Sequence, residues 1–595
     1  MVLSSSSLVA AESSEFVNEK VDRAPAHVHS SESQSIYAES QPGSSSHTIE
    51  AEERPEVFTS NFHEAAAVLV LTFSTVMNTA STGVMQIAVP ALGRYFGISG
   101  GDLSWSVSSF QLMSGATILL FSGIADRIGR KRLVVFAYFW FALWCLIGSF
   151  TTNHIIFDVC RGMQGIASAA CPSAGVGILG STYKNGRRKN RVMAVFNAGA
   201  PIGAFLGVVT GGVTIQYINW RSIFYLYAIV YALLTLLAIF IVPGDNINDN
   251  VKLNPKQVYK RIMEIDLVGA LMSITGCIGF VLAASQASSA SKGWATPYVL
   301  IVLILSIAIL CLFVWWESRV QNPLMPLKIW RAPGFAIVML LILFAWMGFT
   351  GVLNFYGGLY LQDVMGASAI KSTLYLFPQT LASIATVSIV AAFLHVASGR
   401  LILVISSTLM LVASLLWALV PVGAPYYAMV LPAICLEVVS ADLAYNVVNL
   451  HTLSTVSKRE QSTAAGIFYT ISHVAGSLGV SLSTSIVSSI LNREVTAEQL
   501  KGVVAIPVAI TAKAYKGAFW FSVATSAASL VCAVFAKVGK QGARPMMDDE
   551  ANAVLFEDEE EEEEEEGDGA EGVDELSRLL IGASVETGYS AIEKS

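Results

Sequence analysis

The sequence predicts an all-α polytopic membrane protein with about fourteen transmembrane helices. Of its 595 residues, 54% are hydrophobic and only 13% are charged, which excludes a soluble domain with an ordinary charged surface. Apolar runs of about 20 residues, the length that a helix needs to cross the hydrocarbon layer, recur from residue 65 to residue 535. Basic residues gather in alternate loops between these runs, as the positive-inside rule requires.

A polar stretch from Pro243 to Ile265 divides the apolar runs into a group of six and a group of eight. The runs lie near residues 65–84, 105–124, 134–152, 155–180, 193–215 and 223–242, and then near 267–287, 297–316, 335–361, 372–396, 401–420, 426–450, 464–490 and 517–535. Many secondary transporters consist of paired halves around a central site. We therefore expect two six-helix halves, at 63–245 and 333–537, with a cytosolic loop and two inserted helices between them at 246–332.

Both ends of the chain have the composition of disordered tails. Residues 1–62 are rich in Ser, Glu and Ala without an apolar period, and residues 538–595 include a near-unbroken acidic run from Glu557 to Glu566. The loops assigned to the cytosol carry nineteen Lys and Arg residues, whereas the opposite loops carry eight. Because an even number of spans places both ends on one side, this asymmetry predicts that both tails are cytosolic.

Near the C-terminus, Glu575, Leu579 and Leu580 resemble an acidic dileucine sorting signal, which a sorting adaptor would bind. In fungi such a signal can route a membrane protein to the vacuole. The simpler interpretation is that the acidic tail only keeps the protein soluble. We expect a multi-pass protein of the plasma membrane, with the vacuolar membrane as the alternative.

A basic turn at residues 122–132 joins the second and third spans. Gly129 allows a backbone reversal that other residues resist, and the turn places four cations, including Arg127 and Arg130, at one membrane face. This charge orients the protein with the turn in the cytosol. We hypothesise that Asp126 and Arg130 also latch the two halves in one facing state through charge-assisted contacts. The alternative is a turn that only orients the protein.

Glycines recur at every fourth position of the fifth span, at Gly199, Gly203, Gly207 and Gly211, with Pro201 among them. Such a stripe lets another helix approach closely. We expect this face to take part in the conformational change, and a generic packing face is the alternative.

Ionisable side chains inside the apolar runs are few, and they are costly in a membrane unless they are paired or face water. Arg161 lies in the fourth span with Asp158 three residues before it, so the two share a helix face. Glu437 and Asp442 lie in the twelfth span, where Asp442 is well inside the apolar run. We expect these four residues to carry proton coupling. The alternatives are an Arg161 that reaches out to the membrane surface and an Asp442 that serines or a lysine hold in place.

Six further polar side chains within the spans are expected to bind substrate. They are Gln86, Gln111, Gln164, Asn354, Asn446 and His473. An imidazole such as that of His473 can also carry protons near neutral pH, although a packed polar residue is the simpler interpretation.

The turn Asp126-Arg127-x-Gly129-Arg130-Lys131 resembles the signature loop between spans two and three of the major facilitator superfamily, with Ser122 where that family usually has glycine. Arg161-x-x-Gln164-Gly165 resembles the fourth-span pattern of the same superfamily, to which a role in proton handling is attributed. The resemblance covers about residues 63–537 and implies the major facilitator fold.

The fifth span resembles the antiporter motif of the superfamily, with Ala204 in place of the usual proline. The stretch from Asn219 to Phe224 is similar to the Trp-Arg-x-x-Phe of fourteen-span drug:proton antiporters. Ser81 stands where that group often has an acid, so proton coupling through that position is not available. At Gln86 and Asp442 the sequence looks closer to the fungal branch of this group, which includes the aminotriazole-resistance and low-affinity ammonium-type carriers.

The resemblance implies a secondary active transporter. We expect it to export small organic compounds such as drugs, toxins or secondary metabolites in exchange for protons, by alternating access. The alternatives are a facilitator or importer of a small metabolite or ion such as ammonium, and a sensor built on a transporter fold.

No Walker A stretch, metal-ligand spacing or nucleophile elbow occurs, so we expect neither an enzyme nor a cofactor. The expected partners are a small-molecule substrate, protons and the lipid bilayer, without nucleic acid, and the expected state is a monomer.

Overall fold

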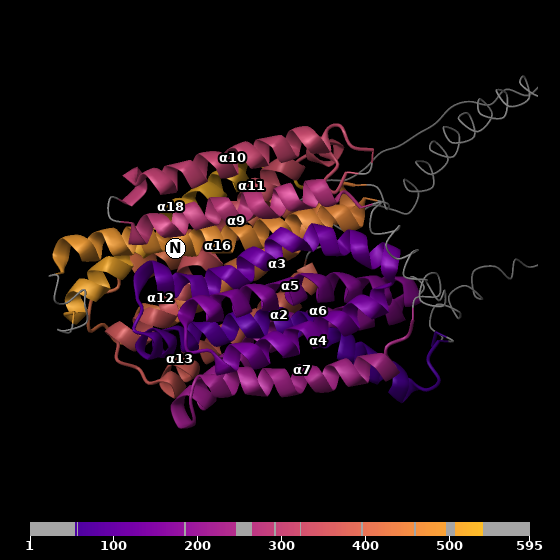
Figure 1. Ribbon diagram of the computed structural model, residues 1–595, viewed down its shortest axis with the longest axis horizontal. Coiled ribbons are helices and arrows are strands. Elements are labelled where there is room, and N and C mark those ends of the chain that lie inside the picture. Colours follow the sequence, from indigo (N-terminus) through magenta and orange to yellow (C-terminus); the bar gives the residue numbers. More distant parts are fainter. Residues whose placement is uncertain are drawn as a thin grey trace, which may run out of the picture. The chain divides into compact units, whose positions relative to one another are not determined.

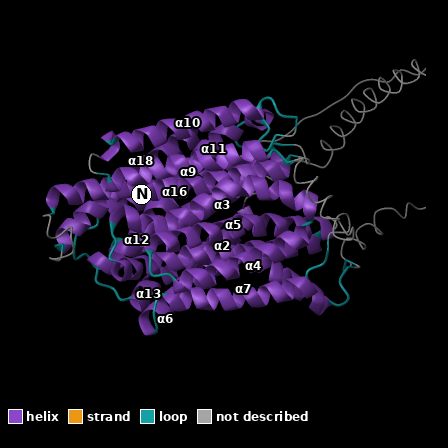
Figure 2. Ribbon diagram, in the orientation of Figure 1, coloured by secondary structure: helices purple, strands orange, loops and turns teal. Residues whose placement is uncertain are grey.

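The computed structural model describes residues 54–55, 57–183, 186–244, 265–290, 293–321, 323–393, 397–456, 460–495 and 506–539. Every element within these ranges is a helix, and the long helices run side by side (Figure 1, Figure 2). The predicted all-α fold is therefore confirmed.

The first half consists of six long helices joined by short turns. They are α2 (Asn61–Phe96), α3 (Gly100–Ile128), α4 (Arg130–Phe150), α5 (His154–Thr182), α6 (Arg187–Tyr217) and α7 (Arg221–Ile241). The side chain of Ser60 caps the start of α2 by accepting a hydrogen bond from the backbone N–H of His63 at 3.1 Å. Gly97 ends this helix with a φ of 67°, which glycine adopts without the strain that a Cβ would cause.

The second half also contains six spans, one of which has an irregular backbone. The helices are α11 (Phe335–Gly348), α12 (Asn354–Leu359), α13 (Ala369–Phe393), α14 (Gly399–Leu419), α15 (Val430–Ser454), α16 (Gln461–Glu494) and α18 (Val508–Phe535). The π-helical segments η3 (Phe349–Leu353) and η4 (Tyr360–Val364) continue α11 and α12 into one span. Such π turns are rare in helices and occur frequently at functional sites.

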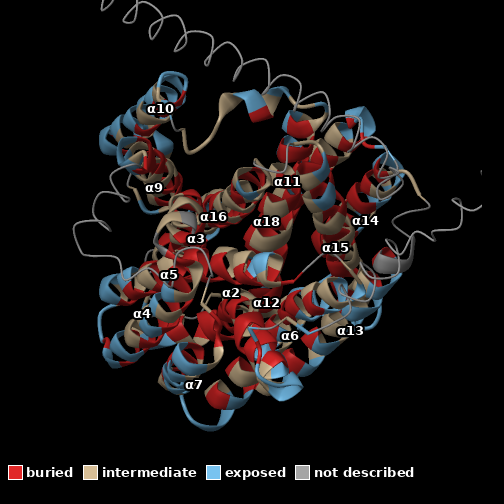
Figure 3. Ribbon diagram, turned by 90° about the vertical axis from the view of Figure 1, so that its right-hand side faces the viewer, coloured by how far each residue is buried: buried red, intermediate tan, exposed pale blue. Residues whose placement is uncertain are grey.

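Two inserted helices, α9 (Leu267–Ser289) and α10 (Pro297–Glu317), lie at the edge of the bundle (Figure 3). The short 3₁₀ turns η1 (Gly293–Ala295) and η2 (Leu327–Arg331) precede and follow α10. α9 packs against α3 and α16, one helix from each half, whereas α10 packs chiefly against α9. Only 17% of the most apolar stretch of α10 is buried in the protein, so most of this helix faces lipid.

Thirteen spans in the described part of the chain are long and apolar enough to cross a membrane. α5 is not among them although it has 29 residues, because small residues and the polar Asp158, Arg161 and Gln164 lower its hydropathy. It nevertheless packs inside the first half against α3 and α4. With α5 included, the bundle has the fourteen spans that the sequence predicts.

The outer faces of the helices are apolar, like the core. Phe240, Ile301 and Leu374 are among the most exposed side chains of the bundle, which suits a surface in contact with lipid rather than water. Many hydroxyl groups bond to a backbone oxygen of their own helix, as where Thr72 Oγ1 donates to the backbone oxygen of Val68 at 2.8 Å. Such bonds lower the cost of polar side chains in hydrocarbon.

The two halves meet chiefly where α3 packs on α16, α6 on α13 and α2 on α12. Thr373 Oγ1 of α13 donates to the backbone oxygen of Val208 in α6 at 3.2 Å. Gln362 Nε2 donates to the backbone oxygen of Ile87 in α2 at 3.1 Å. Both bonds lie in the parts of α2 and α6 nearer their C-terminal ends, so the halves are in contact at that end of the bundle.

At the opposite end of the first half, the buried carboxylate of Glu64 joins three helices. Its Oε1 accepts hydrogen bonds from Tyr183 Oη at 2.8 Å and from Arg188 Nε at 2.9 Å, and Arg188 also forms an ion pair with it. These contacts tie the first turn of α2 to the end of α5 and the start of α6.

The domain boundaries stay a prediction, because residues 246–264 and most of both predicted tails lie outside the described residues.

Candidate functional site

A cavity of about 270 Å³ lies between the two halves. Its wall comes from α2, α3 and α6 of the first half and from the α11–α12 span, α13, α15 and α16 of the second. The lining residues are Asn78, Thr79, Thr82, Gly83, Gln86, Gln111, Ala200, Pro201, Ala204, Val208, Trp346, Phe349, Thr350, Asn354, Leu376, Gln379, Thr380, Ser383, Val438, Ala441, Asp442, Tyr445, Tyr469, Ser472 and His473. A molecule bound here would touch both halves at once.

Amide side chains join the halves across this cavity. Gln86 Nε2 of α2 donates to Asn354 Oδ1 of α12 at 2.6 Å, and Gln379 Nε2 of α13 donates to the same oxygen at 3.4 Å. Asn78 Nδ2 and His473 Nε2, from α2 and α16, lie 3.2 Å apart in a second cross-half hydrogen bond. A substrate that offers its own donors and acceptors can compete for these groups.

Asp442 of α15 is the one carboxylate among the described residues that line the cavity, and no Lys or Arg accompanies it in that wall. Its Oδ2 accepts a hydrogen bond from Ser383 Oγ of α13 at 2.6 Å. Carboxylates that face a cavity inside a membrane protein mark substrate and ion pathways, because a charge there is costly unless it has such a use. Asp442 can exchange a proton through the cavity or attract a cationic group.

Aromatic side chains form one side of the cavity. The rings of Trp346 and Tyr445 lie 5.6 Å apart between centres at an angle of 31°, and Tyr469 lies 6.4 Å from Tyr445. Such rings suit flat or apolar organic molecules. Gln111 of α3 adds a polar side chain to the wall, and its Oε1 is buried next to Gly476 without a hydrogen-bond partner among the described residues.

Arg161 lies behind the cavity wall rather than in it. The side chain is only 1% exposed, and its Nη1 donates to Ser81 Oγ and to Gln164 Oε1, both at 2.8 Å. Its Nε donates to the backbone oxygen of Ser106 at 3.2 Å, and the guanidinium stands 4.6 Å from the centre of the Phe110 ring. These contacts connect α2, α3 and α5 through one buried cation.

Ser81, which stands where an acid is expected in the related antiporters, is thus a direct partner of Arg161. Asp158 reaches the same part of α3, because Ser106 Oγ donates to Asp158 Oδ1 at 3.1 Å. Gln164 is fully buried and its Nε2 donates to the backbone oxygen of Trp144 at 3.3 Å. Asp158 and Arg161 thus both contact Ser106 of α3, and neither lines the cavity.

Glu437 and Asn446 also lie outside the cavity wall. Glu437 Oε2 accepts a hydrogen bond from Trp417 Nε1 of α14 at 2.9 Å, and both side chains are buried within the second half. Asn446 Nδ2 donates to the backbone oxygen of Asp442 at 2.8 Å within α15. Of the predicted proton-coupling and substrate-binding residues, the structure thus brings five together around the cavity, namely Gln86, Gln111, Asn354, Asp442 and His473.

The glycine stripe of α6 faces α2. A Cβ added to Gly199, Gly203 or Gly207 would overlap atoms of α2, and one at Gly211 would press on Val84. The neighbouring face of α6, which includes Pro201, lines the cavity. α6 therefore couples the packing of α2 directly to the shape of the cavity.

In the basic turn, Gly129 ends α3 and begins α4 with a φ of 113°, a region that side chains rarely adopt. Arg130 Nη1 donates to the backbone oxygen of Gly177 in α5 at 3.0 Å, and Arg127 lies half-buried in the last turn of α3. The side chain of Asp126 lies outside the described residues, so its latch role stays a prediction.

Sequence reasoning missed Asn78, Gln379 and Ser383, which all line the cavity. A signal for the first of these exists, because Asn78, Thr82 and Gln86 recur at intervals of four and share one helix face. No group of three or more His, Cys, Asp or Glu side chains that could hold a metal ion occurs among the residues that the structure describes.

Residues 71–480 match the family model of the Major Facilitator Superfamily. The chain belongs to the Major Facilitator Superfamily. It is therefore a multi-pass membrane transporter, and the resemblance seen in the sequence is confirmed.

Characterised and uncharacterised superfamily members from fungi are similar to this chain. The low affinity ammonium transporter of Saccharomyces cerevisiae is 29% identical over 76% of this chain and 86% of its own length. The efflux pump terJ of Aspergillus terreus is 27% identical over 79% of this chain and 88% of its own. The aminotriazole resistance protein of Saccharomyces cerevisiae is 24% identical over 73% of this chain and 79% of its own. The ammonium transporter and the aminotriazole resistance protein are carriers of the fungal branch that the sequence suggests.

Solved structures of the superfamily show the same fold. A bacterial homologue of the human lysosomal transporter Spinster aligns with a TM-score of 0.51 and 14% identity, over 80% of this chain and 96% of its own. The crystal structure of tetrameric PepTSo2 aligns with a TM-score of 0.54 and 12% identity, over 80% of this chain and 97% of its own. At such identities the likeness concerns the fold alone.

Proposed function

We propose that this superfamily member is a proton-coupled exporter of small organic compounds that works by alternating access. The observation that carries the proposal is the central cavity, which both halves line and which holds Asp442 as its carboxylate among the described lining residues. In alternating access the halves rock around a fixed central site. The cross-half bonds made by Gln86 and Asn78 would break and re-form in that motion.

Asp442 is the proposed proton carrier. Its carboxylate forms part of the cavity wall and accepts a bond from Ser383, a neutral hydroxyl that can serve either the charged or the protonated form. In the proposed cycle, Asp442 releases its proton toward the cytosol, substrate binds, and a proton taken up from outside resets the carrier. Export is then driven by inward proton movement.

Arg161 is the second ionisable part of the proposal. It does not line the cavity, but its partner Ser81 is adjacent in α2 to the lining residue Thr82. A change of charge at the cavity can therefore act on Arg161 through α2, and Arg161 in turn fixes α2 against α3 and α5. We place Arg161 as a positioning group for the coupled motion, and Asp158 as its neighbour on α5, which is bonded to Ser106 of α3.

The aromatic wall supports organic substrates. The relatives named as an efflux pump and as an aminotriazole resistance protein support the outward direction. We place this activity in the plasma membrane, where export would remove a toxic compound from the cell, with the vacuolar membrane as the alternative.

A second candidate is the uptake of a small ion or metabolite such as ammonium. The similarity to the low affinity ammonium transporter favours it. The carboxylate of Asp442, which has no Lys or Arg beside it among the described lining residues, would suit a small cation as well as a proton. The two candidates differ in direction and in the size of the substrate.

Transport by purified full-length protein in proteoliposomes tests the proposal. A panel of organic compounds and an ammonium salt would be followed under an imposed pH gradient of either sign. We expect an organic compound to move against its gradient only when protons move the other way. Asp442→Asn should abolish this concentrative transport while it spares exchange of substrate for substrate.

An Asp442→Asn protein that still concentrates substrate, and still loses this capacity when the proton gradient is dissipated, would exclude Asp442 as the carrier. A wild-type protein that ignores the proton gradient would show a facilitator. Movement of ammonium with no organic compound transported would establish the second candidate.

A further inference from the structure

The two inserted helices carry one carboxylate each where they meet at one end of their hairpin. Asp266 caps α9, and its Oδ1 accepts a hydrogen bond from the backbone N–H of Gly269 at 2.8 Å. Glu317 ends α10, and its Oε2 accepts a hydrogen bond from the backbone N–H of Met325 at 3.1 Å. Trp316 Nε1 donates to Asp266 Oδ2 at 2.9 Å, so the ends of α9 and α10 are bonded to each other. Neither carboxylate lines the central cavity.

One oxygen of Glu317 lacks a partner. Glu317 is only 3% exposed, and its Oε1 is buried without a hydrogen bond among the described residues. A Cβ added to Gly269 would stand 3.0 Å from this oxygen and still closer to Asp266 Oδ2. Both oxygens therefore lie beside the same point, which is open because Gly269 has no side chain. Neither carboxylate forms an ion pair with a described residue.

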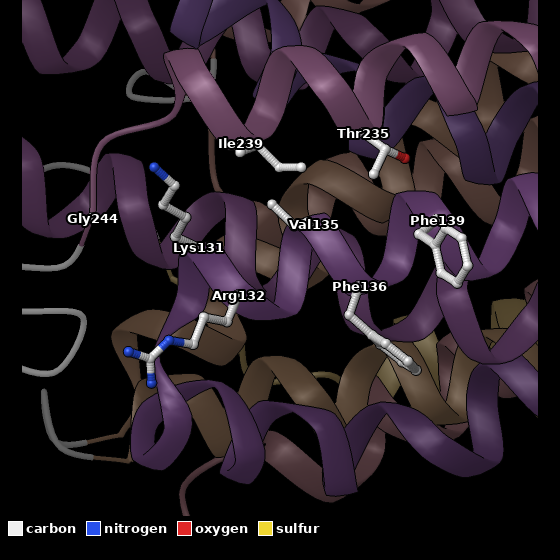
Figure 4. Close-up of a pocket in the computed structure, with 8 residues that line it drawn as sticks. All are labelled: Lys131, Arg132, Val135, Phe136, Phe139, Thr235, Ile239 and Gly244. Atoms are coloured by element: carbon white, nitrogen blue, oxygen red, sulfur yellow. The ribbon is translucent and has the colours of Figure 1, made fainter. Parts of the chain in front are cut away.

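The basic turn that follows α3 lies at the same end of the bundle. Arg127 Nη1 and Ile265 Cγ2 both lie 3.9 Å from the position of a Cβ added to Gly123, so Arg127 is on the side of the bundle that faces the start of α9. Lys131 and Arg132 extend instead along a surface groove between α4 and α7 (Figure 4). The cations of this turn thus contribute a general positive charge near the hairpin but no donor to the buried oxygen.

The other elements at this end also carry charged groups. They are Arg319, which follows α10, Lys328 and Arg331 on η2, and Glu460 at the start of α16. Within the part of the chain that the structure describes, none of them forms an ion pair with either carboxylate of the hairpin. The surrounding cations favour one negative charge on the two carboxylates, and the buried oxygen still needs a donor.

Two neighbouring carboxylates that are shielded from water cannot both be charged at low cost. A metal ion between them would lack ligands, because Ca²⁺ takes about six to eight oxygens and Mg²⁺ about six. No group of three or more His, Cys, Asp or Glu side chains that could hold a metal ion occurs among the described residues. A proton needs only two oxygens. A proton on Glu317 Oε1 can donate to Asp266 Oδ2, which satisfies the buried oxygen and removes one negative charge.

We infer that Asp266 and Glu317 bind one proton between them, at a site separate from Asp442 and the central cavity. The proton holds the ends of α9 and α10 together and, through Glu317, the chain at Met325 that leads into α11. α9 packs against α3 and α16, one helix from each half, so the hairpin braces the two halves. When the pH rises and the proton leaves, the two negative charges repel each other and this end of the hairpin opens.

Infrared spectroscopy of the full-length protein in nanodiscs tests this inference, because the C=O stretch of a protonated carboxyl group is separate from that of a carboxylate. We expect a protonated carboxyl band at neutral pH that Glu317→Gln loses. Asp266→Asn should lose the same band although Glu317 remains. Its amide donates to Glu317 Oε1 in place of the proton, and no second charge then opposes the ionisation of Glu317.

Two control variants identify the band. Glu494→Gln changes an acid that pairs with Lys513 at 2.7 Å near the surface, and it should leave the band unchanged. Asp442→Asn reveals any band that comes from the central cavity, and it should keep the band of the hairpin carboxyl. Gel filtration of each variant checks that it is folded.

Spin labels test the consequence for the brace. Labels at the exposed positions Ser318, directly after α10, and Arg400, at the start of α14, report the distance between the hairpin and the second half. We expect the distance distribution of the wild type to widen at alkaline pH. Glu317→Gln should keep the narrow distribution at both pH values, because the glutamine Nε2 donates to Asp266 Oδ2 whatever the pH.

A carboxyl band that persists in Glu317→Gln would overturn the inference. A band that persists in Asp266→Asn would also overturn it, because Glu317 would then hold its proton alone. Distances that respond to Na⁺, K⁺ or Mg²⁺ at constant pH, and not to pH, would show a metal ion in place of the proton. Equal widening in Glu317→Gln and wild type would show that another group responds to pH.

Discussion

Gln86 and Asn354 belong to opposite halves of the bundle, and Gln86 Nε2 donates a hydrogen bond to Asn354 Oδ1 at 2.6 Å. Both side chains line the central cavity. The backbone of Gln86 also lies against Gly358, so that α2 and α12 touch through side chain and backbone at the same level. This contact must break when the halves separate at that end.

Gln86→Leu should shift the protein toward the state in which that end is open. The substitution removes one hydrogen bond, which contributes about 1 kcal/mol, and should change the ratio of the two states about fivefold. Spin labels at the exposed positions Tyr217 and Tyr427, one on each half, would report the separation. Asn446→Leu is the control, because its amide bonds within α15 only. Identical distance distributions in Gln86→Leu and wild type would contradict the prediction.

Gly358→Val should slow transport by about tenfold or more. A side chain at this position overlaps the backbone of Gln86, and backbone cannot move aside as a flexible side chain does, so overpacking of 1–3 kcal/mol is expected, about tenfold in a conformational equilibrium. Transport rates in proteoliposomes measure the effect. Gly180→Val is the matched control, since nothing lies within 4 Å of the added Cβ. Equal rates for the two variants would show that α2 and α12 need not approach so closely.

Arg161→Gln should destabilise the first half. The change leaves Ser81 and the backbone oxygen of Ser106 without their buried donor, and each unsatisfied buried group costs about 1–3 kcal/mol. The midpoint temperature of thermal unfolding in detergent should clearly fall, and the variant should transport more weakly than the wild type. Arg331→Gln is the control, because it changes an exposed arginine and should leave the midpoint temperature of unfolding unchanged. A stable but inactive Arg161→Gln protein would instead indicate a direct part in coupling.

Glu437→Gln should keep proton coupling, in contrast to Asp442→Asn. Glu437 is buried against Trp417 away from the cavity, and glutamine can still accept the bond from the indole N–H. The ratio of concentrative transport to substrate exchange, measured for both variants, separates them. If Glu437→Gln lost proton coupling while Asp442→Asn kept it, Glu437 rather than Asp442 would be the proton carrier.

Hydropathy and charge were sufficient to predict the helices, because each transmembrane span has to satisfy the same length and polarity. α5 illustrates this, since its apolar run was found although its small and polar residues lower its hydropathy. The positions of site residues were harder to predict. Glu437 and Asp442 lie five residues apart in one apolar run, and only the packing of α14 against α15 decides that Glu437 meets Trp417 while Asp442 meets the cavity.

The partners of Arg161 were also hard to predict from the sequence. Its cost in a membrane predicts that it has partners, but these come from α2 and α3 as well as from its own helix. A single sequence does not reveal which backbone oxygen or hydroxyl a distant helix will present. The polar face of Asn78, Thr82 and Gln86 was accessible to pattern analysis, because four-residue spacing is a property of one helix alone.

The π-helical segments η3 and η4 give the α11–α12 span a way to rotate without breaking. A π turn holds one residue more than an α turn, so a change between the two geometries turns the helix beyond it by about 100° and moves it by about 1.5 Å. Thr350 lies within η3 and Asn354 directly after it, and both line the cavity. A register change of one residue in η3 would swing these polar groups around the helix axis, so the cavity could exchange polar for apolar lining while both halves keep their shape.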